Sequence, residues 1–569
     1  MPESSGGSPK KPKFELTTEM RLLLAFILMG AVLFLTPYLF KQAAPPPAKK
    51  TPSSSAPAKP SAQPGGAPAV APAQAKAAPV PGAVAAEKEE LFTIETALFK
   101  VALSNRGAVI RSWVLKNYKD HAGKPVDVVQ SAAAPRVGFP LALWFKDRKP
   151  SANLDQALYK ATVAPDGLSI AFEYSDGRVA ARKSLRFTKA TYLAHVESLV
   201  TENGQQIPHL FAWRGGFGDA SVPKAHTLQH VIFFDTAANS LTVNDASVAK
   251  DAPVTNGGQY SFAGLEDAYF AAVFLPESNR YFEVRTLSDP LPPAGGGGDE
   301  PHAGAAIGGE GENRFSLFVG PKDLDILRAV NPRLAQVVDF GWFAFLAKPL
   351  FLALNWTNDN LTRNFGWAII LVTVAINFLL FPLKISSFRS MKKMSALQPQ
   401  IQAINEKYRG IGMRDPKKAD QNQEIMDLYK KNSVNPAGGC LPMLLQIPFF
   451  FAFYKVLTVT IELRGAPWLW IADLSLPEAL AIRPLPILMI VTQFILQKMT
   501  PATTADPAQQ RVMLLMPLMF GFMFYGVSSG LVLYWLTGNV IGIVQQWFFN
   551  RTAAVTVTAP QPAKTKKRK

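Results

Sequence analysis

The chain has few of the residues from which disulfide frameworks, metal centres and hydrolytic sites are built. Its 569 residues contain a single cysteine, Cys440, so no disulfide can form within the chain. Cys440 lies where an apolar run begins and is interpreted as a small buried residue. The sequence contains no HExxH motif and no glycine-rich phosphate loop. We therefore expect no enzyme activity and no bound cofactor.

Charge is absent from long stretches of the C-terminal third. Twenty uncharged residues separate Arg363 from Lys384, and no charged residue occurs from Val512 to Asn550. A helix needs about 20 apolar residues to cross a bilayer, and the break YGVSSG at 525–530 would divide the last run into a helical hairpin. The stretches predict five crossings, with bounds 364–383, 440–462, 484–500, 512–527 and 530–549.

The N-terminal region predicts one further crossing. Residues 1–21 are polar, and 22–40 form a nineteen-residue apolar run. The core of a cleaved signal peptide is shorter than this run, so a retained signal anchor is favoured. Residues 41–90 are rich in Ala, Pro and Lys, a composition that cannot bury a core, and are interpreted as an extended tether.

Residues 91–330 change to a period-two pattern. Leu168, Ile170, Phe172 and Tyr174 alternate with polar residues before a Ser-Asp-Gly turn. Similar short runs recur along the region, which predicts a large β-sandwich. Within it, the glycine-rich stretch from 290 to 312 is expected to be a flexible loop.

The region 91–330 also holds all six histidines of the chain. His226 and His230 could chelate a metal ion if they lay on a helix. The following VIFFD favours a strand, on which positions four apart are too distant to share an ion easily. Structural or surface roles are therefore favoured for these histidines, and no metal site is predicted.

Residues 337–354 carry two charges, Asp339 near the start and Lys348 among aromatic and aliphatic residues. Pro349 and the position just before the next apolar run favour an amphipathic interfacial helix over another crossing. The segment 384–434 and the tail 551–569 are strongly basic, and together they carry much of the net charge of +17. Positive charge marks the cytoplasmic side. This predicts six spans with both termini inside and the β domain outside.

The basic segment 384–434 is predicted to be a cytoplasmic helical hairpin. Met394, Leu397, Ile401, Ile404 and Tyr408 repeat at steps of three and four, as in a coiled-coil seam. The hairpin could simply connect two spans or could be a landing site for a partner. Basic loops beside spans are more typical of topology and of anionic lipid than of nucleic acid, and DNA is not expected as a partner.

Several local sequences carry a resemblance to a known family. FPLKISSFRSMKKMSALQPQIQ, LYKKNSVNPAGGCLPMLLQIPFFFAFYKVL, IELRGAPWLWIADLS and SSGLVLYWLTGNV resemble the YidC family of membrane protein insertases, and they cover nearly all of 364–550. The order of span, β domain and five further spans is also similar to that of the Gram-negative members. The resemblance implies a multi-pass protein of the bacterial inner membrane with a periplasmic β domain. Because this domain would lie on the far side of the membrane from arriving substrates and shows no evident reactive set, we expect it to be largely dispensable for insertion.

The resemblance further implies a polar groove in the inner leaflet, through which hydrophobic segments of new proteins reach the bilayer. Family members typically have an arginine five residues before the Pro-Leu of FPL, whereas this chain has Asn377 there, with Thr373 one turn away. For the glutamines of the spans, hydrogen bonding between helices is the simpler alternative. The other polar or amphipathic groove candidates are Gln446, Gln493, Tyr534 and Trp535.

Lys455 is the one charged residue well inside a predicted span. A charge deep in a bilayer is costly and usually functional, so we expect Lys455 to supply the missing charge beside Asn377. The alternative is that Lys455 extends outward towards Glu462. On the fifth span, four methionines share one helical face, which suits either core filling or a slide for varied hydrophobic segments. They are Met513, Met516, Met519 and Met523.

The expected partners are nascent membrane proteins, the Sec translocon, membrane lipids, and the ribosome with the signal-recognition machinery. A solute transporter or channel is the alternative, and a membrane-anchored sugar-processing enzyme is a third possibility. The first would require ionisable residues in several spans or an internal repeat. The residues expected to contact the ribosome or targeting machinery are Lys392, Lys393, Lys566, Lys567, Arg568 and Lys569.

Overall fold

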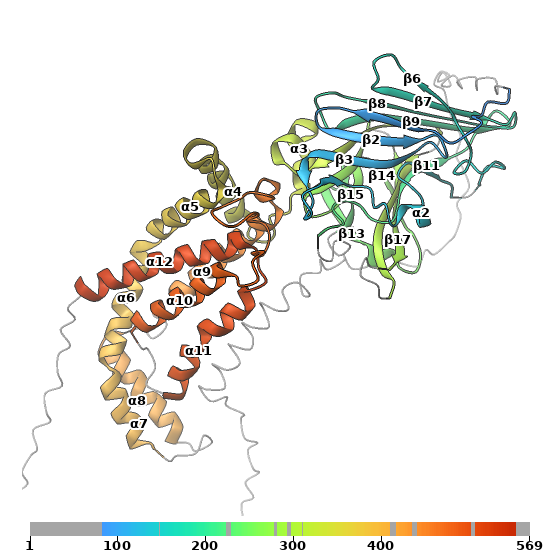
Figure 1. Ribbon diagram of the computed structural model, residues 1–569. Coiled ribbons are helices and arrows are strands. Elements are labelled where there is room, and N and C mark those ends of the chain that lie inside the picture. The colour runs from blue at the N-terminus through green and yellow to red at the C-terminus, as the bar shows by residue number, and fades with distance from the viewer. Residues whose placement is uncertain are drawn as a thin grey trace, which may run out of the picture. The chain divides into compact units, whose positions relative to one another are not determined.

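The computed structural model describes residues 82–146, 148–222, 229–277, 281–292, 298–309, 311–409, 417–434, 441–501 and 507–552 (Figure 1). The described residues belong to two compact units. One contains 399–432, and the other contains the rest of the described chain. The predicted first span 22–40, His226, Cys440 and the end of the tail lie outside the described residues.

Residues 91–321 form a β domain of three antiparallel sheets. A four-stranded sheet has the order β1-β2-β3-β4, a five-stranded sheet the order β14-β17-β18-β11-β5, and a ten-stranded sheet the order β13-β12-β15-β16-β19-β9-β8-β7-β6, with β10 beside β9. The strand bounds are β1 Leu91–Glu95, β2 Phe99–Ser104, β3 Val109–Lys119, β4 Pro125–Asp127, β5 Ala142–Trp144, β6 Lys160–Val163, β7 Ser169–Ser175, β8 Val179–Phe187, β9 Leu193–Glu202, β10 Gln205–Gln206, β11 His209–Trp213, β12 His230–Asp235, β13 Ser240–Asp245, β14 Val254–Gly258, β15 Tyr260–Glu266, β16 Phe270–Pro276, β17 Phe282–Leu291, β18 Glu300–Gly309 and β19 Asn313–Pro321.

The sheets pack face to face through aromatic side chains. Phe211 of the five-stranded sheet stacks on Phe274 of the ten-stranded sheet, with ring centroids 6.0 Å apart. Trp113 of the four-stranded sheet packs against Phe187 of the ten-stranded sheet at 5.7 Å. The period-two pattern thus places one face of each strand in a shared core. The prediction of a large β-rich domain is confirmed.

Strand β8 shows how strictly the alternation holds, because its one charged inward position is Lys183. This side chain is buried, and its Nζ donates hydrogen bonds of 2.8, 3.1 and 2.8 Å to the carbonyl oxygens of Gly107, Ala108 and Leu141. Burial lowers the pKa of Lys183 to about 7. Lys183 therefore stabilises a turn of the neighbouring sheet rather than forming a reactive site.

The prediction of a flexible loop at 290–312 is wrong for most of this range. Strands β17 and β18 pair through this region, up to Leu291 with Glu300. The small residues of β18 allow a close approach of β11, since a Cβ on Gly308 would lie 2.6 Å from the carbonyl oxygen of His209. Gly308 thus reflects packing between strands rather than absence of structure.

Helices follow the β domain. Their bounds are α3 Leu324–Val330, η3 Pro332–Val337, α4 Ala344–Thr357, η4 Asn358–Thr362, α5 Phe365–Leu379, α6 Phe381–Ala396, α7 Gln398–Lys407, α8 Lys417–Lys431, α9 Leu441–Val459, η6 Ile461–Leu463, α10 Pro484–Met499, α11 Pro507–Phe524 and α12 Ser529–Thr552, with the short α2 Ala134–Val137 and η2 Ala246–Ala249 inside the β domain. The break between α11 and α12 lies within the predicted turn at 525–530. The run predicted as 364–383 is instead divided at Leu380, and α6 begins at Phe381 with Pro382 in its first turn.

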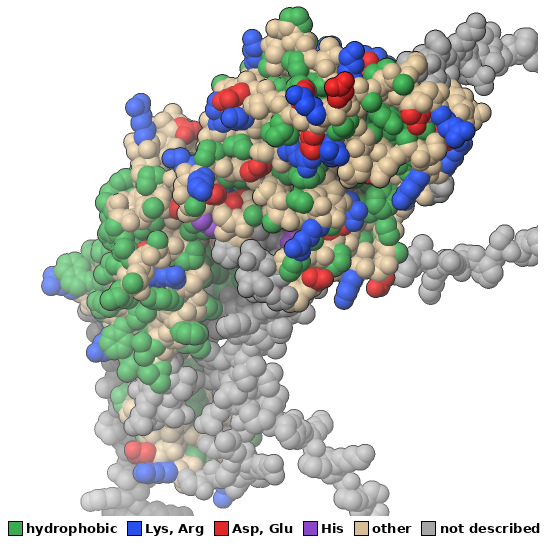
Figure 2. Space-filling model, turned by 45° about the vertical axis from the view of Figure 1, so that its right-hand side comes forward, with side chains coloured by type: hydrophobic (Ala, Val, Ile, Leu, Met, Phe, Trp, Pro, Cys, Tyr) green, Lys and Arg blue, Asp and Glu red, His purple; other side chains and the backbone are tan. Residues whose placement is uncertain are grey.

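Within the described residues, no single helix combines the length and the apolar composition needed to cross a membrane. Helices α4 and α5 meet these conditions only together, with η4, and they are bent by 117°. Large exposed apolar side chains are frequent from residue 342 onward. Figure 2 shows hydrophobic side chains spread over the helical region and charged side chains scattered over the β domain.

The unit at 399–432 contains most of α7 and all of α8. The Nζ of Lys407 lies 2.9 Å from a carboxylate oxygen of Glu424, and Gln421 donates a hydrogen bond of 2.7 Å to Asn405. Ile401 is buried, as a seam position should be. An ion pair and an amide contact thus join the two helices.

Candidate functional site

Helix α12 is the centre of the helical region, because it contacts α5, α9 and α10. Asn364 caps the N-terminus of α5, where its Oδ1 accepts hydrogen bonds from the backbone N–H groups of Gly366 and Trp367. Most of the helix that follows is apolar, with Thr373 and Asn377 on its buried side. The site candidates of α5 therefore lie among helices rather than on the surface.

A polar cluster forms around Asn377, and it includes two residues that were not predicted. Thr373 Oγ1 donates to the carbonyl oxygen of Ile369 at 2.6 Å, and Asn377 Nδ2 donates to that of Thr373 at 2.8 Å. The Nζ of Lys384 donates to Asn377 Oδ1 at 2.6 Å and contacts Oε1 of Gln545 at 3.4 Å. We call Thr373, Asn377, Lys384 and Gln545 the α5–α12 polar cluster.

Lys384 is partly buried, and within the described part of the chain no carboxylate lies within ion-pair distance of its Nζ. Its charge is therefore met only by amide oxygens. A cation held in this way attracts an anionic group more strongly than a lysine that is already paired with an acid. The cluster can thus accept a carboxylate or a phosphate, or solvate a polar segment.

The expected contact between Lys455 and Asn377 is wrong. Lys455 Nζ lies 3.3 Å from Asp339 Oδ2, in the segment before α4, and no ion pair with Glu462 is formed. Helix α9 packs on α4, whereas α5 packs on α12. The charge beside Asn377 comes instead from Lys384, seven residues along the same chain segment.

The remaining groove candidates form contacts between helices. Gln446 Nε2 donates to the hydroxyl of Tyr534 at 2.7 Å, and the ring of Tyr534 stacks on Phe453 with centroids 4.3 Å apart. Trp535 Nε1 donates to Oε1 of Gln493 at 3.3 Å. These bonds agree with the simpler alternative, hydrogen bonding between helices, and they surround α12 with polar contacts on two sides.

The methionine face of α11 is only partly buried. Met519 is 59% exposed, whereas Met516 and Met523 are half-buried, and the side chain of Met513 lies outside the described residues. Phe522 is 88% exposed on the same helix. Helix α11 therefore presents an apolar surface, as a slide would require, although lipid contact would require the same exposure.

The basic candidates are divided between described and undescribed parts of the chain. Lys393 is exposed on α6 and Lys392 is half-buried beside it, whereas Lys566, Lys567, Arg568 and Lys569 lie outside the described residues. Among the described histidines, aspartates and glutamates, no group of three could hold a metal ion.

Two family profiles match the chain. One described as "60Kd inner membrane protein" matches residues 356–556, and one described as "YidC periplasmic domain" matches residues 91–353. The "Membrane protein insertase YidC" of Syntrophus aciditrophicus (strain SB) is 33% identical, over 94% of this chain and 100% of that protein. The protein of the same name from Pelobacter propionicus is 34% identical, over 94% and 99%.

Among solved structures, an "Active YidC insertase crystal structure with the first transmembrane domain resolved" covers 82% of this chain and 95% of its own. Its identity is 20% and its TM-score is 0.36. The sequence similarity, over nearly the whole length of both chains, is thus the stronger of the two comparisons.

Proposed function

Because the chain belongs to the YidC family of membrane protein insertases, we propose that its α5–α12 polar cluster is the point at which a substrate's polar segment enters the membrane. The observation that supports this proposal is the environment of the Lys384 amine. It contacts the amide oxygens of Asn377 and Gln545, and no carboxylate of the described residues lies within ion-pair distance of it. Moving a polar segment through about 30 Å of hydrocarbon is costly because its groups lose water. Polar side chains partway across shorten the dry path.

The proposed topology has six spans, the first at 22–40, and places both termini in the cytoplasm and the β domain in the periplasm. The excess of Lys and Arg in 384–434 and 551–569 supports it. Lys384 then lies near the cytoplasmic end of the second span, where substrates arrive. The substrate's apolar segment leaves sideways into lipid along α11, and no nucleotide is required.

The proposed partners are nascent membrane proteins, the Sec translocon, lipids and the ribosome with its targeting factors. The helical hairpin of α7 and α8 and the basic tail are the surfaces proposed for ribosome contact. Their positive charge supports this, since it attracts ribosomal RNA and anionic lipid alike.

The test is site-specific photocrosslinking to a membrane protein nascent chain stalled on the ribosome. A photoreactive residue at Asn377 or Gln545 should crosslink the nascent chain. The matched control is Leu371, which is on α5 and 44% exposed. Stronger crosslinking from Leu371 than from both cluster positions would contradict the proposed entry point.

A further inference from the structure

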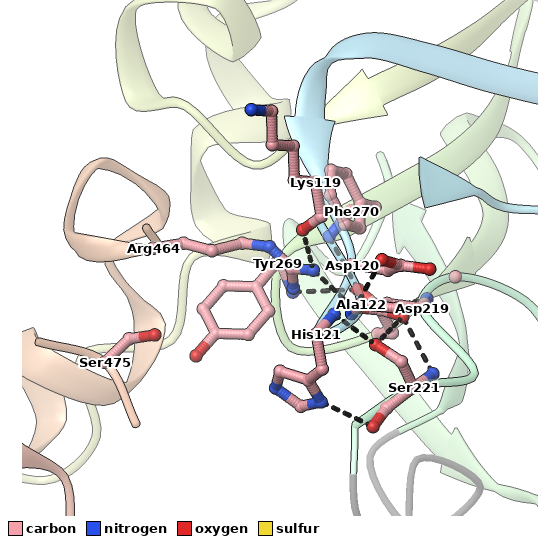
Figure 3. A network of polar contacts seen from close by, with 12 residues as sticks. Lys119, Asp120, His121, Ala122, Asp219, Ser221, Tyr269, Phe270, Arg464 and Ser475 are labelled. Carbon is pink, nitrogen blue, oxygen red and sulfur yellow. Dashed lines mark hydrogen bonds and ion pairs between the residues drawn. The ribbon is translucent and has the colours of Figure 1, made fainter. Parts of the chain in front are cut away.

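The segment between α9 and α10 contacts the β domain through a buried arginine and through Ser475, whose side chain is hydrogen-bonded to Tyr269. The side chain of Arg464 is 7% exposed, and its guanidinium forms an ion pair with Asp219, which is 3% exposed. The same guanidinium donates to the carbonyl oxygen of Lys119 at 2.8 Å and lies 5.0 and 5.4 Å from the ring centroids of Tyr269 and Phe270. Figure 3 shows Arg464 reaching from its segment into this cluster.

Asp219 is held firmly on the side of the β domain. Its backbone N–H donates to Asp267 at 2.9 Å, and Ser221 donates to its carboxylate through both N–H and hydroxyl, at 2.8 and 2.6 Å. Gly218, with φ of +89°, allows this approach, because a Cβ there would lie 1.8 Å from Asp267 Oδ2. Burial raises the pKa of Asp219, but hydrogen bonds from Arg464 and Ser221 outweigh burial and lower it overall. Asp219 is thus a fixed anion.

The segment that follows Arg464 is bonded to the helices. The side chain of Asn364, the cap of α5, donates to the carbonyl oxygen of Pro467 at 2.8 Å. At the start of α12, the N–H groups of Ser529 and Gly530 donate to the carbonyl oxygens of Leu476 and Leu474, at 2.7 and 2.9 Å. Residues 464–476 therefore contact the β domain through Arg464 and Ser475, and the first turns of α5 and α12 through Pro467, Leu474 and Leu476.

We infer that Arg464 is a positioning residue, which fixes the first turns of α5 and α12 relative to the β domain through residues 464–476. These helices carry the α5–α12 polar cluster, so the β domain contributes to the geometry of the proposed entry point without touching a substrate. The inference rests on the proposed function only for its effect on insertion. A buried pair is strongly destabilised when one partner is removed, and far less when both are.

The test measures the distance between two spin labels in the full chain. Cys440→Ser removes the native cysteine, and the labels are attached at Glu173→Cys and Ala481→Cys. In this background the variants compared are Asp219→Ala, Arg464→Ala, the double variant and Arg464→Lys. Glu173 is an exposed position of β7, and Ala481 is an exposed position before α10. Loss of the pair should broaden the distance distribution between the labels in both alanine variants and in the double variant. It should also lower the rate of insertion by at least about 5-fold in each single alanine variant, and by less in the double variant, which leaves no buried charge unpaired. Arg464→Lys should keep a narrower distribution than Arg464→Ala.

The matched control is Arg182→Ala, which removes an exposed ion pair with Glu173 of a neighbouring strand. Because Glu173 must be present in this comparison, the β-domain label is placed at Lys160→Cys in both the control and its parent protein. It should leave both readouts unchanged. An unchanged distance distribution in Asp219→Ala and Arg464→Ala would overturn the inference. So would a broadened distribution with insertion at the parental rate. Crosslinking of a nascent chain from Asn377 in the parent protein tests the proposed function. Its outcome does not depend on the distance distributions or the insertion rates of the variants.

Discussion

Lys384 Nζ donates a hydrogen bond of 2.6 Å to Oδ1 of Asn377, although the helix is interrupted between them at Leu380. Seven residues correspond to two turns, so the two side chains remain on one face across the break. The flexible stem of lysine spans the remaining distance. Asn377 is thus supplied with a positive charge by a residue of the next helix, α6.

Lys384→Ala should reduce insertion of a substrate with an acidic translocated tail by about tenfold, the effect of roughly 1.4 kcal/mol. Lys384→Arg should keep most of the insertion activity. Adding Asn377→Arg to Lys384→Ala should restore the activity that the alanine substitution removes. Insertion is measured by protease protection of the tail in membrane vesicles. Lys455→Ala is the matched control, because Lys455 pairs with Asp339 instead. Equal loss in both alanine variants would show that the position of the charge is unimportant.

His230 makes the stability of the β domain dependent on pH. Burial lowers its pKa, but the ring nitrogens form ion pairs with the carboxylates of Asp245 at 3.2 Å and Glu266 at 3.6 Å, which outweigh burial and raise the pKa to about 9. Glu266 is shared with Lys322. Because the folded-state pKa exceeds the unfolded value of about 6.5, the stabilisation is complete below about pH 6.5 and is lost as the pH rises to about 9.

Replacing His230 by Gln should therefore remove much of this dependence. The melting temperature of the parent protein in detergent should fall more between pH 6 and pH 9 than that of His230→Gln, by the equivalent of about 1–3 kcal/mol. Thermal unfolding followed by circular dichroism at both pH values measures the difference. Parallel behaviour of the two proteins would mean that the ion pairs of His230 contribute nothing to stability.

The close contact of Gly366 with Trp468 predicts a second stability effect. A Cβ on Gly366 would lie 2.1 Å from Cδ1 of Trp468, a buried ring. Gly366→Ala should destabilise the protein by about 1–3 kcal/mol, as overpacking does. Gly538→Ala on α12 is the control, because its Cβ would meet nothing within 4 Å, and it should be neutral or stabilising. A stable Gly366→Ala protein would show that Trp468 can move aside.

Sequence patterns predicted what depends on local periodicity. The alternation at Leu168 to Tyr174 corresponds to β7, and the break at 525–530 lies between α11 and α12. The placement of Thr373 and Asn377 on one buried face also followed from helical spacing. Patterns of this kind are read within one element, and they do not depend on which elements meet.

Contacts between distant elements could not be predicted in this way. Lys384 was treated as the end of an apolar run, so its side chain was not considered as part of the site. The expectation that Lys455 lies beside Asn377 is wrong because it depends on which helices pack together, and α9 packs on α4. Arg464 and Asp219 are 245 positions apart, and neither lies in a motif that names the other.

The basic tail is predicted to strengthen ribosome binding. Deleting Lys564–Lys569 should weaken co-sedimentation with ribosomes, and the difference should be largest at low salt, where charge is least screened. Deleting six uncharged residues, 553–558, is the matched control and should have little effect. Identical binding of both deletion variants at every salt concentration would remove the tail from the binding surface.

The last prediction compares two ways of losing the contact at Asp219. Asp219→Ala in the full chain leaves the charge of Arg464 buried against Tyr269 and Phe270, with its Nε already lacking an acceptor. A chain that joins residues 1–45 directly to 330–569 removes the whole β domain, so Arg464 is released into water. Stranding a buried charge costs about 3–5 kcal/mol, whereas an exposed arginine costs almost nothing.

The shortened chain should therefore insert substrates better than the full chain with Asp219→Ala, at matched levels in the membrane. Adding Arg464→Ala should improve the Asp219→Ala protein and leave the shortened chain unchanged. Protease protection of the same substrate in vesicles compares all four proteins. If the shortened chain is stable and correctly oriented but inserts less than Asp219→Ala, the β domain contributes to insertion by more than the position of residues 464–476.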